Sequence, residues 1–200
     1  CLESFYINMH KHIPNLFVFL DHYDKHIFKN NIKNIGIIYR NYNNSKNVKE
    51  LIKITNECKR KRFPIFISND SKLAIKVKAD GIYIPAFNKT KQFKNLENKN
   101  FSLLGSAHNQ KEINEKILQK CEGIFLSPLF YVKKRKSFLN IHKFNLLVNS
   151  NNAKFFALGG INEKNITKLN LLNIKGFAGI SIFKKKTGLK RPVFLKNNFF

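Results

Sequence analysis

The sequence has 200 residues, 43% of them hydrophobic, a length that favours one domain and suffices to bury a core without disulfide bonds or a structural metal. Its cysteines, Cys1, Cys58 and Cys121, are widely spaced and form no CxxC pair, which excludes a disulfide framework and a zinc knuckle and fits a reducing cytosol. The 37 Lys and Arg residues against 12 Asp and Glu residues give a net charge of +25. Such a charge predicts attraction to polyanions. The alternative is a drift in composition, because AT-rich codons favour lysine.

Short apolar runs recur along the whole chain at intervals of about 20 to 25 residues, each followed by a polar or amphipathic stretch. The runs are Leu16–Leu20, Ile35–Tyr39, Pro64–Ile67, Gly81–Ile84, Ser102–Leu104, Gly123–Leu126, Lys154–Leu158 and Gly176–Ile180. This alternation predicts βα units and a parallel sheet. We expect an α/β fold in which residues 1–200 form a single (β/α)8 TIM barrel, because each unit has about 25 residues. A doubly wound sheet is the alternative, but the chain lacks a GxGxxG fingerprint.

Helical patterns fill the gaps between these runs. The segment Asn109–Lys120 places Ile113, Ile117 and Leu118 on one face, with Asn109 as N-cap and Glu112 at the capping-box position. The segments Asn47–Arg62 and Asn162–Leu172 have similar patterns, the latter with Asn162 as its cap. The basic tail, residues 184–200, either forms a closing helix or packs loosely.

Glycines follow the last two strands. Gly159 and Gly160 come after the seventh run, and Gly179, Ile180 and Ser181 end the eighth. Glycine lets backbone N–H groups approach an anion, a helix N-terminus favours negative charge, and barrels often hold a phosphate at these two loops. We therefore predict a phosphate site here; two tight turns are the simpler alternative.

Functional residues of a TIM barrel lie at the C-terminal ends of its strands. Arg40 follows the second strand and has the fork geometry that suits a diphosphate, although a solvated rim arginine fits equally. Asn69 and Asp70 follow the third strand, where an amide and a carboxylate suit Mg²⁺ bridged to phosphates, or simply a helix N-cap. After the fifth strand, Ser106 can donate to a phosphate, and His108 is either a general acid–base or a capping histidine.

A basic run, Lys133–Lys136, follows the sixth strand and includes Arg135. A basic loop over an anionic site would neutralise a departing diphosphate. A solvated charge run is the alternative.

Together these segments resemble the thiamine phosphate synthase/TenI family. The resemblance covers residues 35–183 and is carried by IYRNY, FISNDSKLAIKVKADGIYI, LLGSAHNQKEI, GIFLSPLF, FFALGGINEKNI and GFAGISIF. It implies a transferase of thiamine biosynthesis that couples hydroxymethylpyrimidine diphosphate to thiazole phosphate with the help of Mg²⁺. By position, it implies diphosphate binding by Arg40, Asn69, Ser106 and Arg135, metal binding by Asp70 and the residue at position 88, and thiazole phosphate binding by Gly160, Ile180 and Ser181.

Three positions depart from the family pattern. Ile38 replaces a glutamine, Tyr42 replaces a basic residue, and Asn88 replaces the second Mg²⁺-binding aspartate. These changes affect the metal–diphosphate side and leave the thiazole phosphate side intact, a pattern similar to that of TenI-type relatives. The alternative function is therefore a thiazole tautomerase that uses His108, or a non-catalytic thiazole phosphate binder.

The sequence also predicts a setting for the protein. No apolar run approaches the ~18 residues of a membrane span, and residues 1–10 lack the hydrophobic segment of a signal peptide. We expect a soluble, cytoplasmic protein with small phosphorylated substrates and no membrane partner. A basic nucleic-acid-binding protein is a second alternative, but no RNA-binding motif supports specific recognition. Whether the chain forms a homo-oligomer stays open.

Overall fold

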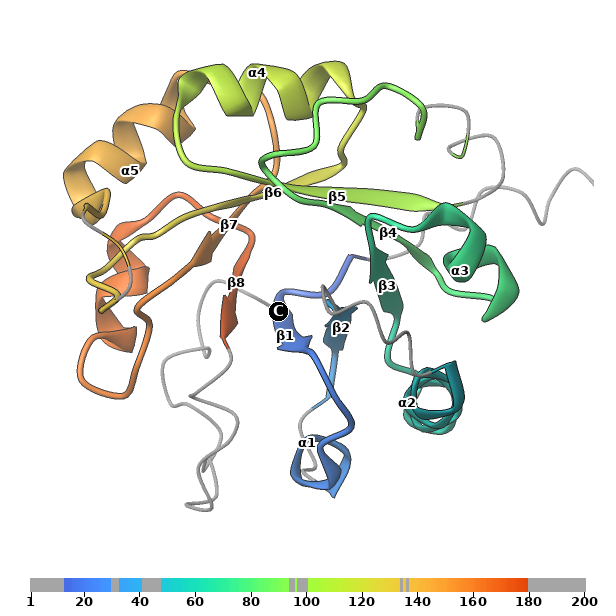
Figure 1. Cartoon of the computed structure of the whole chain (residues 1–200). Helices are drawn as coiled ribbons and strands as arrows, with labels where there is room; N and C mark the ends of the chain where they lie inside the picture. Colours follow the sequence, from blue (N-terminus) through green and yellow to red (C-terminus); the bar gives the residue numbers. More distant parts are fainter. Residues whose placement is uncertain are drawn as a thin grey trace, which may run out of the picture.

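The computed structural model describes residues 13–29, 33–40, 48–93, 96, 101–133, 135 and 137–179. Eight parallel strands close into a barrel in the order of the sequence, so the predicted TIM barrel is confirmed and the doubly wound sheet is excluded (Figure 1). The strands are β1 (Leu16–Leu20), β2 (Ile35–Tyr39), β3 (Ile65–Ser68), β4 (Gly81–Ile84), β5 (Ser102–Ala107), β6 (Gly123–Leu126), β7 (Phe155–Leu158) and β8 (Gly176–Gly179). The last contact pairs β8 with β1, where Val18 lies beside Gly179.

Aromatic side chains fill the inside of the barrel. Phe17 of β1 lies edge-on to Phe125 of β6 and Phe156 of β7, with ring centroids 5.0 and 5.2 Å apart. Such edge-to-face pairs stabilise a core beyond the area that they bury. A Cβ at Gly36, beside Phe17 on β2, would lie 2.4 Å from the Phe17 ring, so the glycine makes room for this packing.

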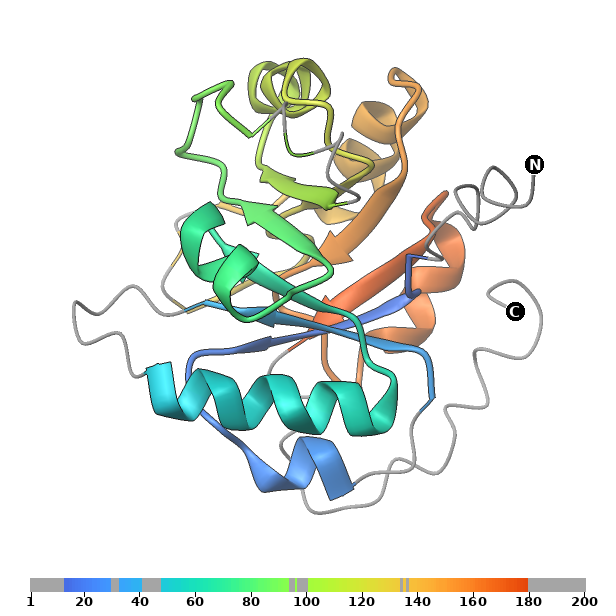
Figure 2. The same ribbon diagram turned by 90° about the vertical axis from the view of Figure 1, so that its right-hand side faces the viewer.

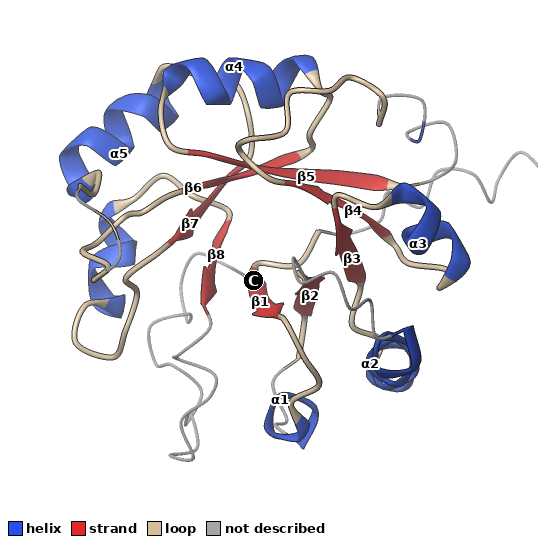
Figure 3. Cartoon of the chain, in the orientation of Figure 1, coloured by secondary structure: helices blue, strands red, loops and turns tan. Residues whose placement is uncertain are grey.

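Helices cover the outer face of the strands (Figures 2 and 3). They are α1 (Lys25–Lys29), α2 (Val48–Lys61), α3 (Ser71–Lys76), α4 (Gln110–Leu118), α5 (Asn140–Asn149) and the 3₁₀ helix η3 (Ile166–Leu171). A second, larger apolar cluster lies between the outward side chains of the strands and these helices. Every helix in the described ranges is too short or too polar to cross a membrane.

Two helix predictions are wrong in detail. The segment after β7 forms no α-helix from Asn162, because the regular structure there is the 3₁₀ helix that begins at Ile166. On α4, Ile113 is buried as predicted, but Ile117 and Leu118 are 40% and 51% exposed, and Lys116 is buried instead. The basic tail, residues 184–200, lies outside the described residues.

Candidate functional site

A cavity of about 570 Å³ opens at the C-terminal ends of the strands. Tyr83 and Leu158 contribute to its lining from β4 and β7, and the loop after β4 contributes Pro85, Ala86 and Phe87. Five residues singled out from the sequence also line this cavity, and they come from four different strands or the loops after them: Arg40, Ser106, His108, Arg135 and Gly159. The barrel therefore brings together residues that are up to about 120 positions apart in the chain.

Two arginines supply the positive charge of this cavity. Arg40 lies at the end of β2, where its Nε donates to Asp21 at 3.3 Å and its guanidinium lies 5.1 Å from the centre of the Phe19 ring. These contacts hold the guanidinium at the mouth of the barrel. Arg135 lines the same cavity from the loop after β6, where its backbone N–H donates to the carbonyl oxygen of Val132 at 2.8 Å. Guanidinium groups bind phosphate oxygens through two parallel hydrogen bonds, so the pair suits a phosphorylated ligand.

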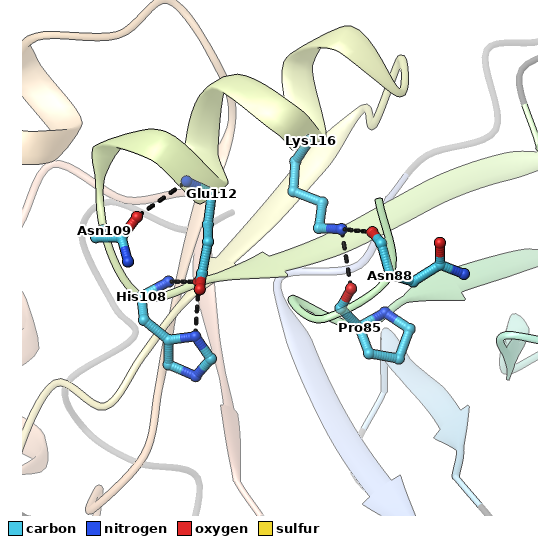
Figure 4. Close-up of polar contacts among 6 residues, drawn as sticks. All are labelled: Pro85, Asn88, His108, Asn109, Glu112 and Lys116. Carbon is cyan, nitrogen blue, oxygen red and sulfur yellow. Dashed lines mark hydrogen bonds and ion pairs between the residues drawn. The ribbon is translucent and has the colours of Figure 1, made fainter. Parts of the chain in front are cut away.

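His108 is held by a carboxylate from the helix that follows it. One oxygen of Glu112 accepts the backbone N–H of His108 at 2.7 Å and lies 2.7 Å from its ring Nδ1 (Figure 4). The Asn109 side chain accepts the backbone N–H of Glu112 at 3.0 Å, which confirms Asn109 as N-cap. With Nδ1 as the donor to Glu112, Nε2 is the acceptor, a tautomer that suits a base. Glu112 also lines the cavity, although the sequence indicated only a capping role for it.

The predicted metal residues lie on the β3–β4 side of the mouth. Asp70 caps α3, since one of its oxygens accepts the Leu73 N–H at 2.9 Å, as the alternative interpretation had it. Asn69 and Asn88 approach each other through a hydrogen bond from Nδ2 of Asn88 to Oδ1 of Asn69, and Oδ1 of Asn88 accepts from Thr90 at 2.7 Å. The described ranges contain no cluster of three His, Cys, Asp or Glu side chains. One carboxylate with two mutually bonded amides fits Mg²⁺ only as an ion that arrives with a diphosphate.

The loop after β7 contains the predicted phosphate glycines. Gly159 and Gly160 have φ angles of +93° and +73°, a region that L side chains rarely adopt, so glycine is required there. A Cβ at Gly160 would lie 2.6 Å from the carbonyl oxygen of Phe130. The backbone N–H of Asn162 donates to the side-chain oxygen of Asn165, and the backbone N–H of Lys164 donates to the side-chain oxygen of Asn162. Both N–H groups therefore already have an acceptor within the loop. Ile180 and Ser181 lie outside the described residues, and Gly179 ends β8.

Three further features escaped the sequence analysis. The Ser68 hydroxyl at the end of β3 is buried without a hydrogen-bond partner among the described residues, which is unusual for a native hydroxyl. A second cavity of about 510 Å³ shares His108 and Arg135 with the first and adds Ser137 and Lys143. Burial raises the pKa of the Cys121 thiol to about 12, so this thiol is unreactive.

The comparisons with known proteins identify the family and the fold of the chain. The family described as thiamine monophosphate synthase, TMP-TENI, matches residues 26–183. The chain belongs to this family.

Among curated members of the thiamine monophosphate synthase family, a thiamine-phosphate synthase of Prochlorococcus marinus subsp. pastoris is 29% identical over 153 residues, covering 75% of this chain and 44% of the relative. A thiamine-phosphate synthase from another strain of that species is 32% identical over 138 residues, covering 67% of this chain and 39% of the relative. The chain thus spans less than half the length of these relatives. The solved structure of thiamine phosphate pyrophosphorylase from Pyrococcus furiosus superimposes with a TM-score of 0.68, 16% identity and coverage of 86% and 88% of the two chains.

Proposed function

We propose that this chain catalyses the thiamine phosphate synthase reaction, in which hydroxymethylpyrimidine diphosphate is coupled to thiazole phosphate and diphosphate is released. The observation that carries the proposal is the convergence of Arg40, Arg135 and the buried Ser106 on one cavity at the C-terminal mouth. Family membership supports the same reaction.

The chemistry asks for charge stabilisation more than for a base. The bond between the pyrimidine methylene carbon and the diphosphate breaks, and negative charge accumulates on the leaving group. Arg40 and Arg135 would bind that charge, and the Ser106 hydroxyl would donate to a phosphate oxygen. Preorganised donors of this kind cost no reorganisation at the moment of reaction.

Mg²⁺ would enter with the diphosphate and neutralise part of its charge. Asp70 is the carboxylate that would hold it from the protein side, with Asn69 and Asn88 beside it. Mg²⁺ is commonly bound through one or two carboxylates and substrate phosphates, so a single aspartate is a weak but adequate anchor. The thiazole phosphate would occupy the glycine loops after β7 and β8.

The test is turnover by the purified protein with both phosphorylated substrates and Mg²⁺. We expect thiamine phosphate to form, and Arg135→Met to lower kcat/KM by about 10²-fold or more because a strong contact to the leaving group is lost. Arg60→Met is the matched control, since Arg60 pairs with Glu57 on the outside of α2 and is 64% exposed. Folded protein that forms no product above background would refute the proposal.

A second candidate is a proton-transfer function, a thiazole tautomerase. It is favoured by the His108–Glu112 pair, because a histidine oriented by a carboxylate is surplus to a reaction that needs no base. His108→Ala should then abolish tautomerisation of the thiazole phosphate, a loss of about 10²- to 10⁴-fold, while the affinity for the ligand is kept. An unchanged rate would remove His108 from the mechanism, whereas ligand binding without tautomerisation in the original protein would leave a thiazole phosphate binder.

A further inference from the structure

A fully buried lysine lies behind one wall of the cavity. Lys116 of α4 has no exposed surface, and a Cβ at Gly105 of β5 would lie 2.7 Å from its Cδ, so only glycine leaves room for its stem. Its Nζ donates to the carbonyl oxygens of Pro85 and Asn88 at 2.9 and 2.7 Å (Figure 4). It also donates to Oε1 of Gln119 at 2.8 Å. An ammonium group has three donors, and each of them is used.

Gln119, at the end of α4, completes the attachment. Its Nε2 donates to the carbonyl oxygens of Asn88 and Thr90 at 2.9 and 2.8 Å. The segment 85–90 after β4 therefore receives four hydrogen bonds from two side chains of the α4 region. We call this arrangement the Lys116–Gln119 clamp.

Fold stability alone gives no reason for this lysine. All three of its acceptors are uncharged, and a buried ammonium without a paired carboxylate costs more than an apolar side chain of the same length. Burial accordingly lowers the pKa of Lys116. A buried charge kept at such a cost usually fixes one conformation of its surroundings.

The segment that the clamp holds contributes directly to the site. Pro85, Ala86 and Phe87 line the cavity, and the Asn88 amide donates to Asn69. Phe87 itself is 68% exposed, and the hydrogen bonds from the α4 region reach the backbone of this segment. The conformation of this wall therefore depends on the carbonyl oxygens that Lys116 and Gln119 bind.

We propose that Lys116 is a positioning residue that, with Gln119, fixes the segment 85–90 as the diphosphate-side wall of the cavity and thereby sets the affinity for the pyrimidine diphosphate. The identity of the ligand rests on the proposed function, whereas the fixing of the segment rests on the contacts alone. A loosened segment would place Asn88 and Phe87 poorly for the diphosphate ligand. It would leave the predicted thiazole phosphate side at Gly159 and Gly160, on the loop after β7, unaffected.

The test compares Lys116→Met with Lys111→Met. Methionine keeps an unbranched apolar stem over Gly105 and removes all three donors, and Lys111 is an exposed lysine of the same helix. Hydrogen exchange measured by mass spectrometry should be about tenfold faster in residues 86–90 of Lys116→Met and unchanged in Lys111→Met. Calorimetry should find inorganic diphosphate with Mg²⁺ bound about tenfold more weakly by Lys116→Met, and thiazole phosphate bound as before.

Unchanged exchange in residues 86–90, or an equal loss of affinity for both ligands, would overturn the proposal. If Lys116→Met does not fold, Gln119→Glu decides, because the glutamate gives the ammonium a charged partner while removing both amide donors to the segment. It must show the same two effects, faster exchange and selectively weaker diphosphate binding. Should the original protein bind no diphosphate, the proposed function fails, and the exchange measurement still tests the clamp.

Discussion

Asp70 caps α3 and, under the proposed function, would also be the ligand of the diphosphate-bound metal, and two substitutions separate these roles. Replacement by Ala removes both, whereas Ser keeps a side-chain oxygen that can accept the Leu73 N–H, now 2.9 Å from the carboxylate. Loss of an N-cap costs about 1 kcal/mol, and Ser caps about as well as Asp. For a domain of this size, that loss lowers the melting temperature by about 2–4 °C.

We therefore expect Asp70→Ala to melt about 2–4 °C lower than the original protein and Asp70→Ser to melt close to it. Both variants should lose about 10²-fold or more in turnover, because neither supplies the negative charge that faces the metal. Thermal unfolding followed by circular dichroism, and a discontinuous assay of thiamine phosphate, measure the two effects. Full activity in Asp70→Ser would refute the ligand role and leave Asp70 as a cap alone.

Three further predictions concern the metal, the glycine loop and the clamp. Asn88→Asp should keep the contact to the Thr90 amide and tighten Mg²⁺ binding in the presence of diphosphate; calorimetry that finds the same affinity would place position 88 outside the metal site. Gly160→Ala should lower the free energy of unfolding by about 1–3 kcal/mol in a urea titration, because the left-handed backbone and the Phe130 carbonyl both oppose a Cβ; an unchanged midpoint would contradict this loop conformation. Burial lowers the pKa of Lys116 below its ordinary 10.5, so near that pH the unfolded chain binds more protons than the folded protein. The free energy of unfolding relative to Lys116→Met should therefore rise as the pH increases toward 10.5, and a difference that stays flat would contradict the lowered pKa.

The barrel could be predicted because its strands are apolar on both faces. Four of the eight predicted runs have the observed bounds, and β1, with all five residues buried, is one of them. Side chains of β1 alternate between the aromatic interior and the helix layer, so each needs to be apolar. The predicted cavity residues followed from the same pattern, since a strand whose end is known also places the residue after it.

Capping and loop chemistry could be predicted only in part. Asn109 could be predicted as a cap because its side-chain oxygen accepts the backbone N–H of Glu112, only three residues ahead. A contact this local leaves a recognisable sequence pattern. Asn162 was wrong as the cap of an α-helix because the Asn162 N–H donates to the Asn165 side chain and the Asn165 N–H donates back to the Asn162 carbonyl oxygen, and the 3₁₀ helix begins only at Ile166. Local hydrogen bonds from asparagine compete with a helix start, and the sequence does not say which of them prevails.

The inner side of α4 could not be predicted, and its polarity is what connects it to the site. A helix that covers a barrel is expected to turn its apolar residues inward, which favoured Ile117 and Leu118. Beside the buried Ile113, the side chains that point inward from α4 are instead Glu112, to His108, and Lys116, to the loop after β4 (Figure 4). These two residues are four positions apart and so share a face. The partner of Glu112 is the ring nitrogen of His108, four residues earlier, whereas Lys116 binds the carbonyl oxygens of Pro85 and Asn88, which only the fold brings within reach. A hydrophobic pattern cannot identify a face whose partners are polar, so polar residues at helical spacing beside a strand end are the signal to search for in other members of the family.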